Sequence, residues 1–193
     1  MRHHHIILGL LWLSYCLIHS ILARSYARLW VMGFLNIRKD TYRVIYNVFA
    51  LVSLAAILIY QFRITAIRLF RPGMTLRIIA ILFLTAGLII MLICIRKYFL
   101  QLSGLVKEEH NKRVLETGGI HQYVRHPLYL GTFIFITGLF ILFPFLSNLI
   151  AVAIIMAYTI IGILFEEKKL IEEFGEHYRQ YQQNVPMLLP FLK

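Results

Sequence analysis

The sequence predicts an all-α integral membrane protein with about five transmembrane helices, a polar cytoplasmic loop and a C-terminal amphipathic helix. Three observations predict this fold. Hydrophobic residues make up 60% of the 193 residues, against roughly 45 to 50% in soluble domains. They are concentrated in five runs, each about the length of a membrane-spanning helix. Basic residues gather between the runs. We expect a single membrane domain over residues 1–193.

Each apolar run predicts one helix, and the runs lie at residues 6–23, 42–62, 76–95, 128–146 and 147–165. The last two are separated only by Leu146-Ser147-Asn148, with Pro144 just before, so they predict a tight helical hairpin. The first run ends in small residues followed by a basic one, so a cleaved signal peptide is the weaker alternative there.

One ionisable residue, His19, falls inside the first run near its predicted cytoplasmic end. Polar groups within a span are rare and often functional. A hydrogen bond between helices is the other interpretation, and the sequence alone favours it.

Lys and Arg are distributed unevenly, with fifteen on the face of the C-terminus and five on the other. Loops rich in Lys and Arg stay in the cytoplasm, so we expect the N-terminus outside and the C-terminus inside. The net charge of +11 would suit nucleic acid, but no basic run interleaved with aromatic residues stands outside the hydrophobic segments. We therefore expect membrane lipids, and no nucleic acid, as partners.

The connection over residues 96–127 is too long for an idle loop, which indicates a function. Its apolar residues recur at helical spacing beside basic ones. This pattern predicts either a helix lying in the membrane interface or a plain extension of the third span. The apolar positions are Tyr98, Phe99, Leu102, Leu105 and Val106.

A further amphipathic helix is predicted after the fifth span, where one apolar stripe faces a charged side. Pro186 ends this pattern. We expect the helix to fold back over the cytoplasmic face. For Tyr178 the sequence leaves packing or a hydrogen bond in the site open, with a slight preference for packing. The stripe consists of Leu170, Ile171, Phe174, Tyr178 and Tyr181.

The segment from Thr117 to Tyr129 concentrates glycine, histidine and arginine in an otherwise apolar chain. Proline suits the first position of a helix, so Pro127 predicts that the loop leads directly into a helix N-terminus. Such an end favours a carboxylate or phosphate. Gly118 and Gly119 allow the backbone to approach a ligand closely.

Two adjacent acids, Glu166 and Glu167, lie at the cytoplasmic mouth of the fifth span. Alone they would be a solvated helix end, as His126 alone would be a helix cap, and Arg125 alone a contact for lipid phosphate. Opposite a helix start, the carboxylates can receive the positive part of the same ligand. The arrangement predicts a zwitterionic or cationic small molecule.

These residues resemble the integral-membrane methyltransferases, the group of isoprenylcysteine carboxyl methyltransferase and the phospholipid N-methyltransferases. The resemblance covers about residues 96–193, with its two halves in the right order. It is carried by Leu115-x-Thr117-x-Gly119-x-x-x-Tyr123-x-Arg125-His126-Pro127-x-Tyr129, then Glu166-Glu167-x-x-Leu170, then Phe174-Gly175-x-x-Tyr178-x-x-Tyr181-x-x-x-Val185-Pro186.

The resemblance implies S-adenosylmethionine as cofactor, S-adenosylhomocysteine as product, and a cytoplasmic cofactor-binding loop formed by residues 96–129 and 164–190. It implies a lipophilic, membrane-dissolved acceptor and no metal. Arg125 and Glu167 are the candidate catalytic residues, and Arg125 either shapes the loop or faces the substrate. The implied cofactor contacts are Arg113, Val114, Leu115, Glu116, Gly119, His121, His126, Pro127, Leu128, Tyr129 and Glu166.

Two positions depart from the family pattern. His121 stands where the family usually has tyrosine. The isoprenylcysteine enzymes carry an arginine about one turn before the glutamates, whereas this chain has Ile160-Ile161-Gly162-Ile163. A desolvated carboxylate without a partner is costly, so an amine or thiol acceptor is favoured over an isoprenylcysteine carboxylate.

Two other classes of function remain as alternatives. Membrane sterol reductases that use NADPH resemble this family around Arg125-His126-Pro127-x-Tyr129, but the Glu166-Glu167-Lys168-Lys169 segment is unlike theirs. A non-enzymatic membrane protein with a decayed motif is the second alternative, and the altered His121 supports it.

Overall fold

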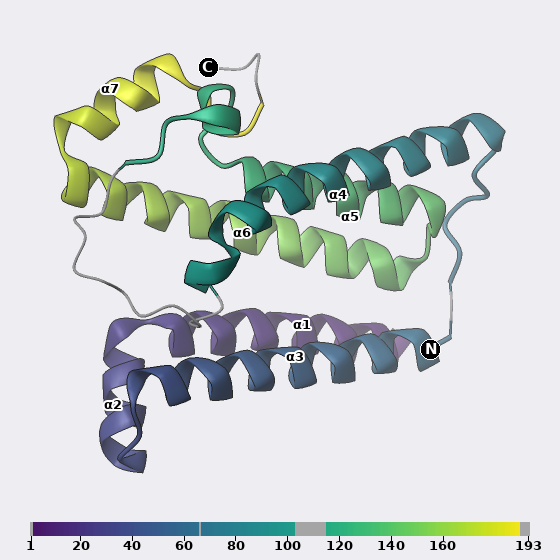
Figure 1. Ribbon diagram of the computed structural model, residues 1–193. Coiled ribbons are helices and arrows are strands. Elements are labelled where there is room, and N and C mark those ends of the chain that lie inside the picture. The colour runs from purple at the N-terminus through teal and green to yellow at the C-terminus, as the bar shows by residue number, and fades with distance from the viewer. Residues whose placement is uncertain (1, 66, 103–114, 190–193) are drawn as a thin grey trace. The chain divides into compact units, whose positions relative to one another are not determined.

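The computed structural model describes residues 2–65, 67–102 and 115–189, and these are helical apart from connecting segments and one isolated bridge between Arg68 and Phe145 (Figure 1). The predicted all-α fold is confirmed. The helices are α1 (Arg2–Ala23), α2 (Ser25–Leu35), α3 (Lys39–Arg63), α4 (Met74–Leu102), η1 (Gly119–Gln122), α5 (Pro127–Leu142), α6 (Leu146–Phe174) and α7 (Glu176–Asn184).

Within the described part of the chain, four helices are long and apolar enough to cross a membrane: α1, α3, α4 and α6. The fourth predicted span corresponds to α5, which is apolar but has only 16 residues, fewer than the roughly 20 that a bilayer requires. It begins at Pro127 and ends at Leu142, before the Pro144 turn. The turn to α6 therefore lies at 143–145, and Ser147 and Asn148, predicted to form it, belong to α6.

The structure divides into two compact units. The N-terminal unit comprises Met1–Arg71 and Pro144–Ile155, and the C-terminal unit comprises Pro72–Phe143 and Met156–Lys193. Each is described by itself.

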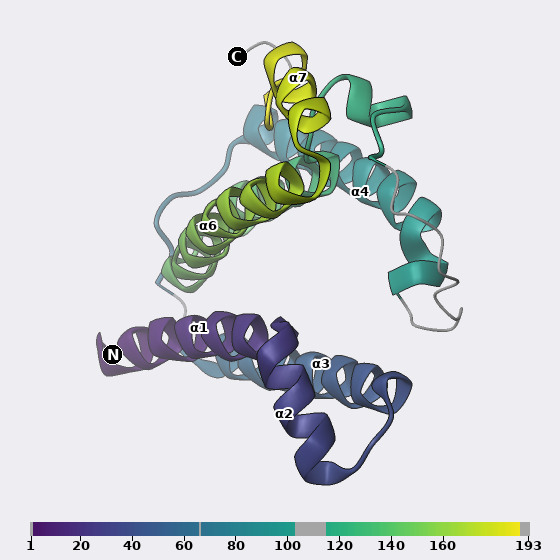
Figure 2. The ribbon, with the colours of Figure 1, turned by 90° about the vertical axis from the view of Figure 1, so that its left-hand side faces the viewer.

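In the N-terminal unit α1 and α3 lie side by side (Figure 1). Leu8, Trp12, Ile57 and Ala151 form its buried core. Figure 2 shows α2, which the sequence did not predict, leading away from α1. None of its residues is buried, so no apolar stripe marked it. It ends at Asn36, whose φ of 50° is left-handed, as is common after the last turn of a helix.

The same unit closes its connections through backbone hydrogen bonds. The amide of Leu69 donates to the carbonyl of Pro144 at 2.8 Å, and the amide of Leu146 donates to that of Ile67, also at 2.8 Å. Two segments far apart in sequence thus satisfy each other's backbone hydrogen-bonding groups where the helices end.

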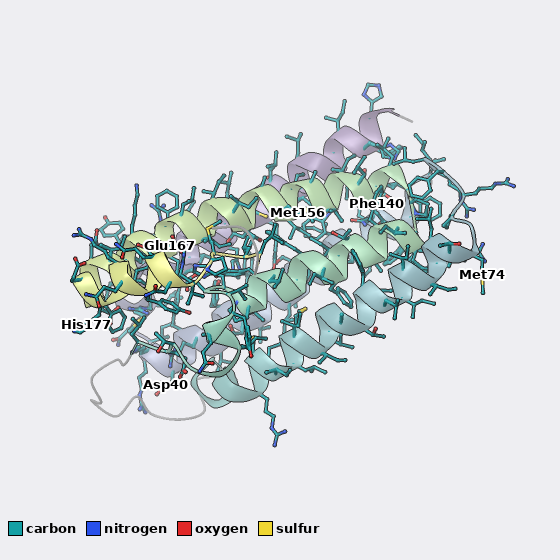
Figure 3. The ribbon with its side chains drawn as sticks, turned by 90° about the horizontal axis from the view of Figure 1, so that it is seen from above. Asp40, Met74, Phe140, Met156, Glu167 and His177 are labelled. Atoms are coloured by element: carbon teal, nitrogen blue, oxygen red, sulfur yellow. The ribbon has the colours of Figure 1, made fainter. Side chains whose placement is uncertain are left out.

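In the C-terminal unit α4 and α5 pack closely, and Figure 3 shows Met74 and Phe140 toward the same end of the pair, so the helices are antiparallel. Glycines permit the approach. A Cβ on Gly87 would lie 2.6 Å from the backbone nitrogen of Phe135, and one on Gly138 would lie 2.8 Å from the carbonyl oxygen of Ala80. Small residues allow membrane helices to pack in this way. This packing fixes α5, whose first residue follows the predicted site.

The third span continues as α4 to Leu102, so the extension interpretation of the following segment is confirmed that far. Leu105 and Val106 lie outside the described residues. The predicted C-terminal amphipathic helix is present, but its single stripe is divided: the helix breaks at Gly175, where φ is +57°, into the end of α6 and a separate α7. Glycine adopts this conformation without strain.

Candidate functional site

The loop before α5 depends on Gly119, whose φ of +63° is one that L side chains rarely adopt. Oε1 of Glu116 supports the turn by accepting a hydrogen bond from the amide of Gly118 at 3.0 Å. Nδ1 of His121 lies 3.2 Å from the carbonyl oxygen of Arg125, which closes the loop on itself. We therefore assign Glu116 and His121 a structural part in shaping this loop.

The loop leads into α5 as predicted, with Pro127 at the first helical position. The side chain of His126 makes no capping hydrogen bond, so the simple cap interpretation does not describe it. Instead, the backbone amides of Arg125 and His126 donate to the carbonyls of Pro186 and Met187, at 2.9 and 3.1 Å. The segment after α7 therefore lies along the loop.

Arg125 is the buried cation of the site, with only 10% of its side chain exposed. Its Nε donates to Oε1 of Glu167 at 2.7 Å. Its Nη1 donates to the carbonyl of Gln182 at 3.1 Å and also to that of Val185. A planar guanidinium with several donors suits such a junction, where lysine would not. Arg125 thereby joins the loop to both α6 and the end of α7.

Glu167 is the buried anion at the same junction, 13% exposed. Besides Arg125, its carboxylate contacts Nε2 of His126 at 3.1 Å, and it accepts hydrogen bonds from the hydroxyl of Tyr178 at 3.3 Å and the side-chain amide of Gln182 at 2.9 Å. Figure 3 labels Glu167 near the end of α6. A buried carboxylate with four partners is well satisfied.

Tyr178 both packs and binds within the site. It is 1% exposed, and burial together with the negative charge of Glu167 raises its pKa. The hydroxyl therefore stays protonated and available as a donor. Leu115 and the predicted apolar stripe pack around it, and the hydroxyl of Tyr181 donates to the carbonyl of His121 at 2.6 Å. Figure 2 shows α7 beside the segment with η1.

Glu166 differs from its neighbour because 45% of its side chain is exposed. One oxygen accepts a hydrogen bond from the hydroxyl of Tyr129 at 3.0 Å and lies 4.0 Å from Nδ1 of His126. The rings of His126 and Tyr129 are 5.8 Å apart. These three side chains form the edge of the cluster at which Glu166 is exposed, whereas the His126 side chain is only 5% exposed, and we call them the rim.

The structure gathers most of the predicted site residues around the start of α5, while Arg113 and Val114 lie outside the described residues. Leu128, in the first turn of α5, accepts a hydrogen bond through its carbonyl from Thr132. Gln182 was missed, although it follows Tyr178 by one helical turn, a spacing that places both on the same side of α7. The backbone carbonyls of Val185, Pro186 and Met187 were also missed, because a role of the backbone leaves no pattern of side-chain types in the sequence.

An apolar cavity of about 460 Å³ lies in the same unit. It is lined by Phe83 of α4, by residues of α5 beginning at Leu130, and by Met187, Leu188 and Leu189. Leu130 follows Tyr129 directly, and Met187 binds the amide of His126. Among the residues described, no group of three or more His, Cys, Asp or Glu side chains could hold a metal ion.

Long apolar helices together with a network of charged side chains at the start of α5 describe an integral membrane protein. The model of the phospholipid methyltransferase family matches residues 75–177, and this chain belongs to that family.

Several characterised proteins are similar to the chain. Methanethiol S-methyltransferase 1 of Bradyrhizobium diazoefficiens is 31% identical over 185 residues, which cover 90% of this chain and 62% of that protein. Methanethiol S-methyltransferase of Crocosphaera subtropica is 35% identical, covering 45% and 33%. Protein-S-isoprenylcysteine O-methyltransferase of Schizosaccharomyces pombe is 37% identical, covering 47% and 39%. The chain thus spans less than two thirds of these relatives. No solved structure matches it significantly.

Proposed function

We propose that this chain is a membrane methyltransferase that transfers a methyl group from S-adenosylmethionine to a lipophilic acceptor thiol or amine dissolved in the bilayer. The observation that carries the proposal is the rim of Glu166, Tyr129 and His126, which borders the start of α5. The family match supports the reaction class. The positive-inside distribution of Lys and Arg supports cofactor entry from the cytoplasm.

The residues of the rim fit the methionine part of S-adenosylmethionine. The half-exposed Glu166 carboxylate suits its ammonium group. The amides of Leu128 and Tyr129 precede the first intrahelical bond of α5, which Leu130 donates to His126, and such amides suit a carboxylate. When bound, the cofactor supplies an electrophilic methyl group. The protein residues hold and orient it, because in-line approach matters more for this reaction than acid or base chemistry.

Arg125 and Glu167, the candidate catalytic residues, are proposed to act by positioning. Their polar groups are directed at each other, at His126 and at the chain around α7. They therefore hold the loop and the helix start in place, while Glu166 meets the ligand.

The apolar cavity supports a lipophilic acceptor, because the described residues that line it carry no charged side chain and only one hydroxyl, that of Thr137. A carboxylate buried there would lack a cation. The absence of a basic residue at Ile160-Ile161-Gly162-Ile163 points the same way, and two of the relatives named above are thiol methyltransferases. The uncharged lining and the lack of a basic residue favour a thiol or amine over a carboxylate, and the two relatives favour a thiol.

The proposal is tested by calorimetric binding of S-adenosylhomocysteine to the detergent-purified protein. We expect saturable binding that is lost in Glu166→Ala and His126→Ala. Glu172→Ala, an exposed acid on the same helix, is the matched control and should bind like the wild type. No binding by the wild type, or equal binding by all variants, would refute the site, and NADPH in the same cell would identify a reductase. Methyl transfer is then measured with lipophilic thiols, amines and carboxylates of equal chain length, to identify the class of acceptor.

A further inference from the structure

The N-terminal unit contains a cavity of its own between α1 and α3, with a volume of about 250 Å³. Its lining runs from His19 and Tyr46 at one end to Leu11 and Ile57 at the other. Eight residues of helix separate Leu11 from His19, so the cavity is about 12 Å long. It is narrow, apolar along most of its length, and polar at one end.

The polar end is an aromatic cluster that holds the ring of His19. The hydroxyl of Tyr46 lies 3.0 Å from each ring nitrogen of His19, and Tyr15 stacks on the same ring, with centroids 5.8 Å apart. One hydroxyl bonds well with only one nitrogen at a time. A neutral imidazole offers both a donor and an acceptor, so His19 keeps the capacity for a second partner. The helix-to-helix hydrogen bond predicted for His19 therefore exists and leaves room for another role.

Ser14 and Tyr15 also line the cavity, whereas several other polar side chains of these helices form hydrogen bonds elsewhere. Ser53, which lines the cavity, donates its hydroxyl to the carbonyl of Phe49 at 2.6 Å. Further along, the indole of Trp12 donates to Gln61 at 3.0 Å, and Gln61 donates to Asn148 at 2.8 Å. These hydrogen bonds join Trp12, Gln61 and Asn148 to one another within the N-terminal unit. The cluster of Tyr15, His19 and Tyr46 forms the polar end of the cavity, where a head group would bind.

We propose that α1 and α3 form a binding site for a small, neutral, membrane-dissolved molecule with an apolar body and one hydroxyl or carbonyl head. The head bonds to His19 and Tyr46, and the body lies along the alanine and isoleucine side chains toward Ile57. None of the lining residues in the described part of the chain is Lys, Arg, Asp or Glu, which disfavours a charged head. The volume lies below the roughly 300 to 1,000 Å³ of drug-sized ligand pockets, so the molecule is small. This site is separate from the proposed methyl transfer and requires no cofactor.

The test uses the tryptophan that reports on the apolar end. Trp12 contacts Ile57 within one core cluster, and the chain has two tryptophans, so Trp30→Phe leaves Trp12 as the sole fluorophore. Excitation at the red edge of the tryptophan absorption avoids the eleven tyrosines, so the emission comes from Trp12 as the one remaining tryptophan. The full-length protein in detergent is titrated with hexanol carrying a terminal bromine, whose heavy atom quenches tryptophan. Bromohexane, which lacks the hydroxyl, measures non-specific partition. We expect saturable quenching by bromohexanol and weak, linear quenching by bromohexane.

Two variants separate the head group from the cavity. Tyr46→Phe keeps the ring that stacks on Tyr42 and removes the hydroxyl, so affinity should fall about fivefold or more. Ala50→Leu fills the cavity and should abolish saturation, while Ala55→Leu, on the same helix outside the lining, should bind like the wild type. Identical quenching by both bromo compounds, or saturation that survives Ala50→Leu, would overturn the proposal.

Discussion

Replacing Arg125 by alanine should release the C-terminal segment from the site without disturbing the membrane helices. The substitution removes the hydrogen bonds to Glu167, Gln182 and Val185. It also leaves Glu167 buried without its cation, and breaking a buried ion pair costs roughly 3 to 5 kcal/mol. Because Glu167 keeps His126 as a partner, we expect the lower end, about 3 kcal/mol. This corresponds to roughly a hundredfold rise in the local opening equilibrium.

Amide hydrogen exchange measured by mass spectrometry reads this equilibrium directly. In Arg125→Ala the peptides that cover residues 176–187 should exchange about a hundredfold faster, whereas those from α4 should not change. Arg179→Ala is the matched control, because its pair with Glu176 spans 3.6 Å with the two side chains 61% and 64% exposed. Such surface pairs contribute roughly 0 to 1 kcal/mol. Arg125→Lys keeps the charge but loses the planar fork, and should fall between the two.

The positioning role would be refuted by one pattern of results. If Arg125→Ala exchanged no faster than Arg179→Ala over residues 176–187 and yet abolished methyl transfer, Arg125 would touch the reactants rather than hold the scaffold.

Two further predictions concern the packing around the site. Gly87→Ala should destabilise the protein by about 1 to 3 kcal/mol, seen as a lower unfolding midpoint in detergent, because the new Cβ would lie 2.6 Å from the backbone of Phe135. Gly162→Ala, where nothing lies within 4 Å, should leave the midpoint unchanged or raise it slightly, and equal losses in both would contradict the packing argument. Tyr181→Phe removes the donor to the carbonyl of His121 and should cost about 0.5 to 1.5 kcal/mol. It should also weaken S-adenosylhomocysteine binding by loosening the loop, and unchanged stability and affinity would argue against that anchor.

The long helices were predictable because a bilayer allows few other structures. Backbone groups in hydrocarbon must bond internally, so each apolar run predicts the presence of a helix, although α4 and α6 continue well beyond their runs. The run at residues 42–62 became α3 (Lys39–Arg63). The short α2 and the pairing of Leu69 with Pro144 were not predictable, because exposed helices and backbone hydrogen bonds leave no apolar pattern. The hairpin turn was misplaced for a similar reason: Ser147 and Asn148 looked like turn residues, but α6 absorbs them.

The sequence marked the residues that the structure gathers at the start of α5, but not which of them are buried and which are exposed. Glu166 and Glu167 are adjacent and identical in type, and successive helical residues point about 100° apart. Which carboxylate turns inward depends on where α7 docks, and that depends on the break at Gly175 and on carbonyls such as that of Val185. None of these appears in a pattern of side-chain types.

Under the proposed function, this difference in burial would let one segment both bind a ligand and remain rigid. Arg125 joins the loop, α6 and the end of α7 through three acceptors, while its neighbour His126 contacts both glutamates, at 3.1 and 4.0 Å. Any shift of the buried pair would therefore move the rim through His126. Since a small misplacement of reacting groups is costly in rate, the proposed function and the proposed positioning role of Arg125 together predict that losing Arg125 lowers kcat through geometry. If kcat falls in the same order as amide exchange over residues 176–187 rises, from wild type through Arg125→Lys to Arg125→Ala, the buried pair acts on the rim through its position.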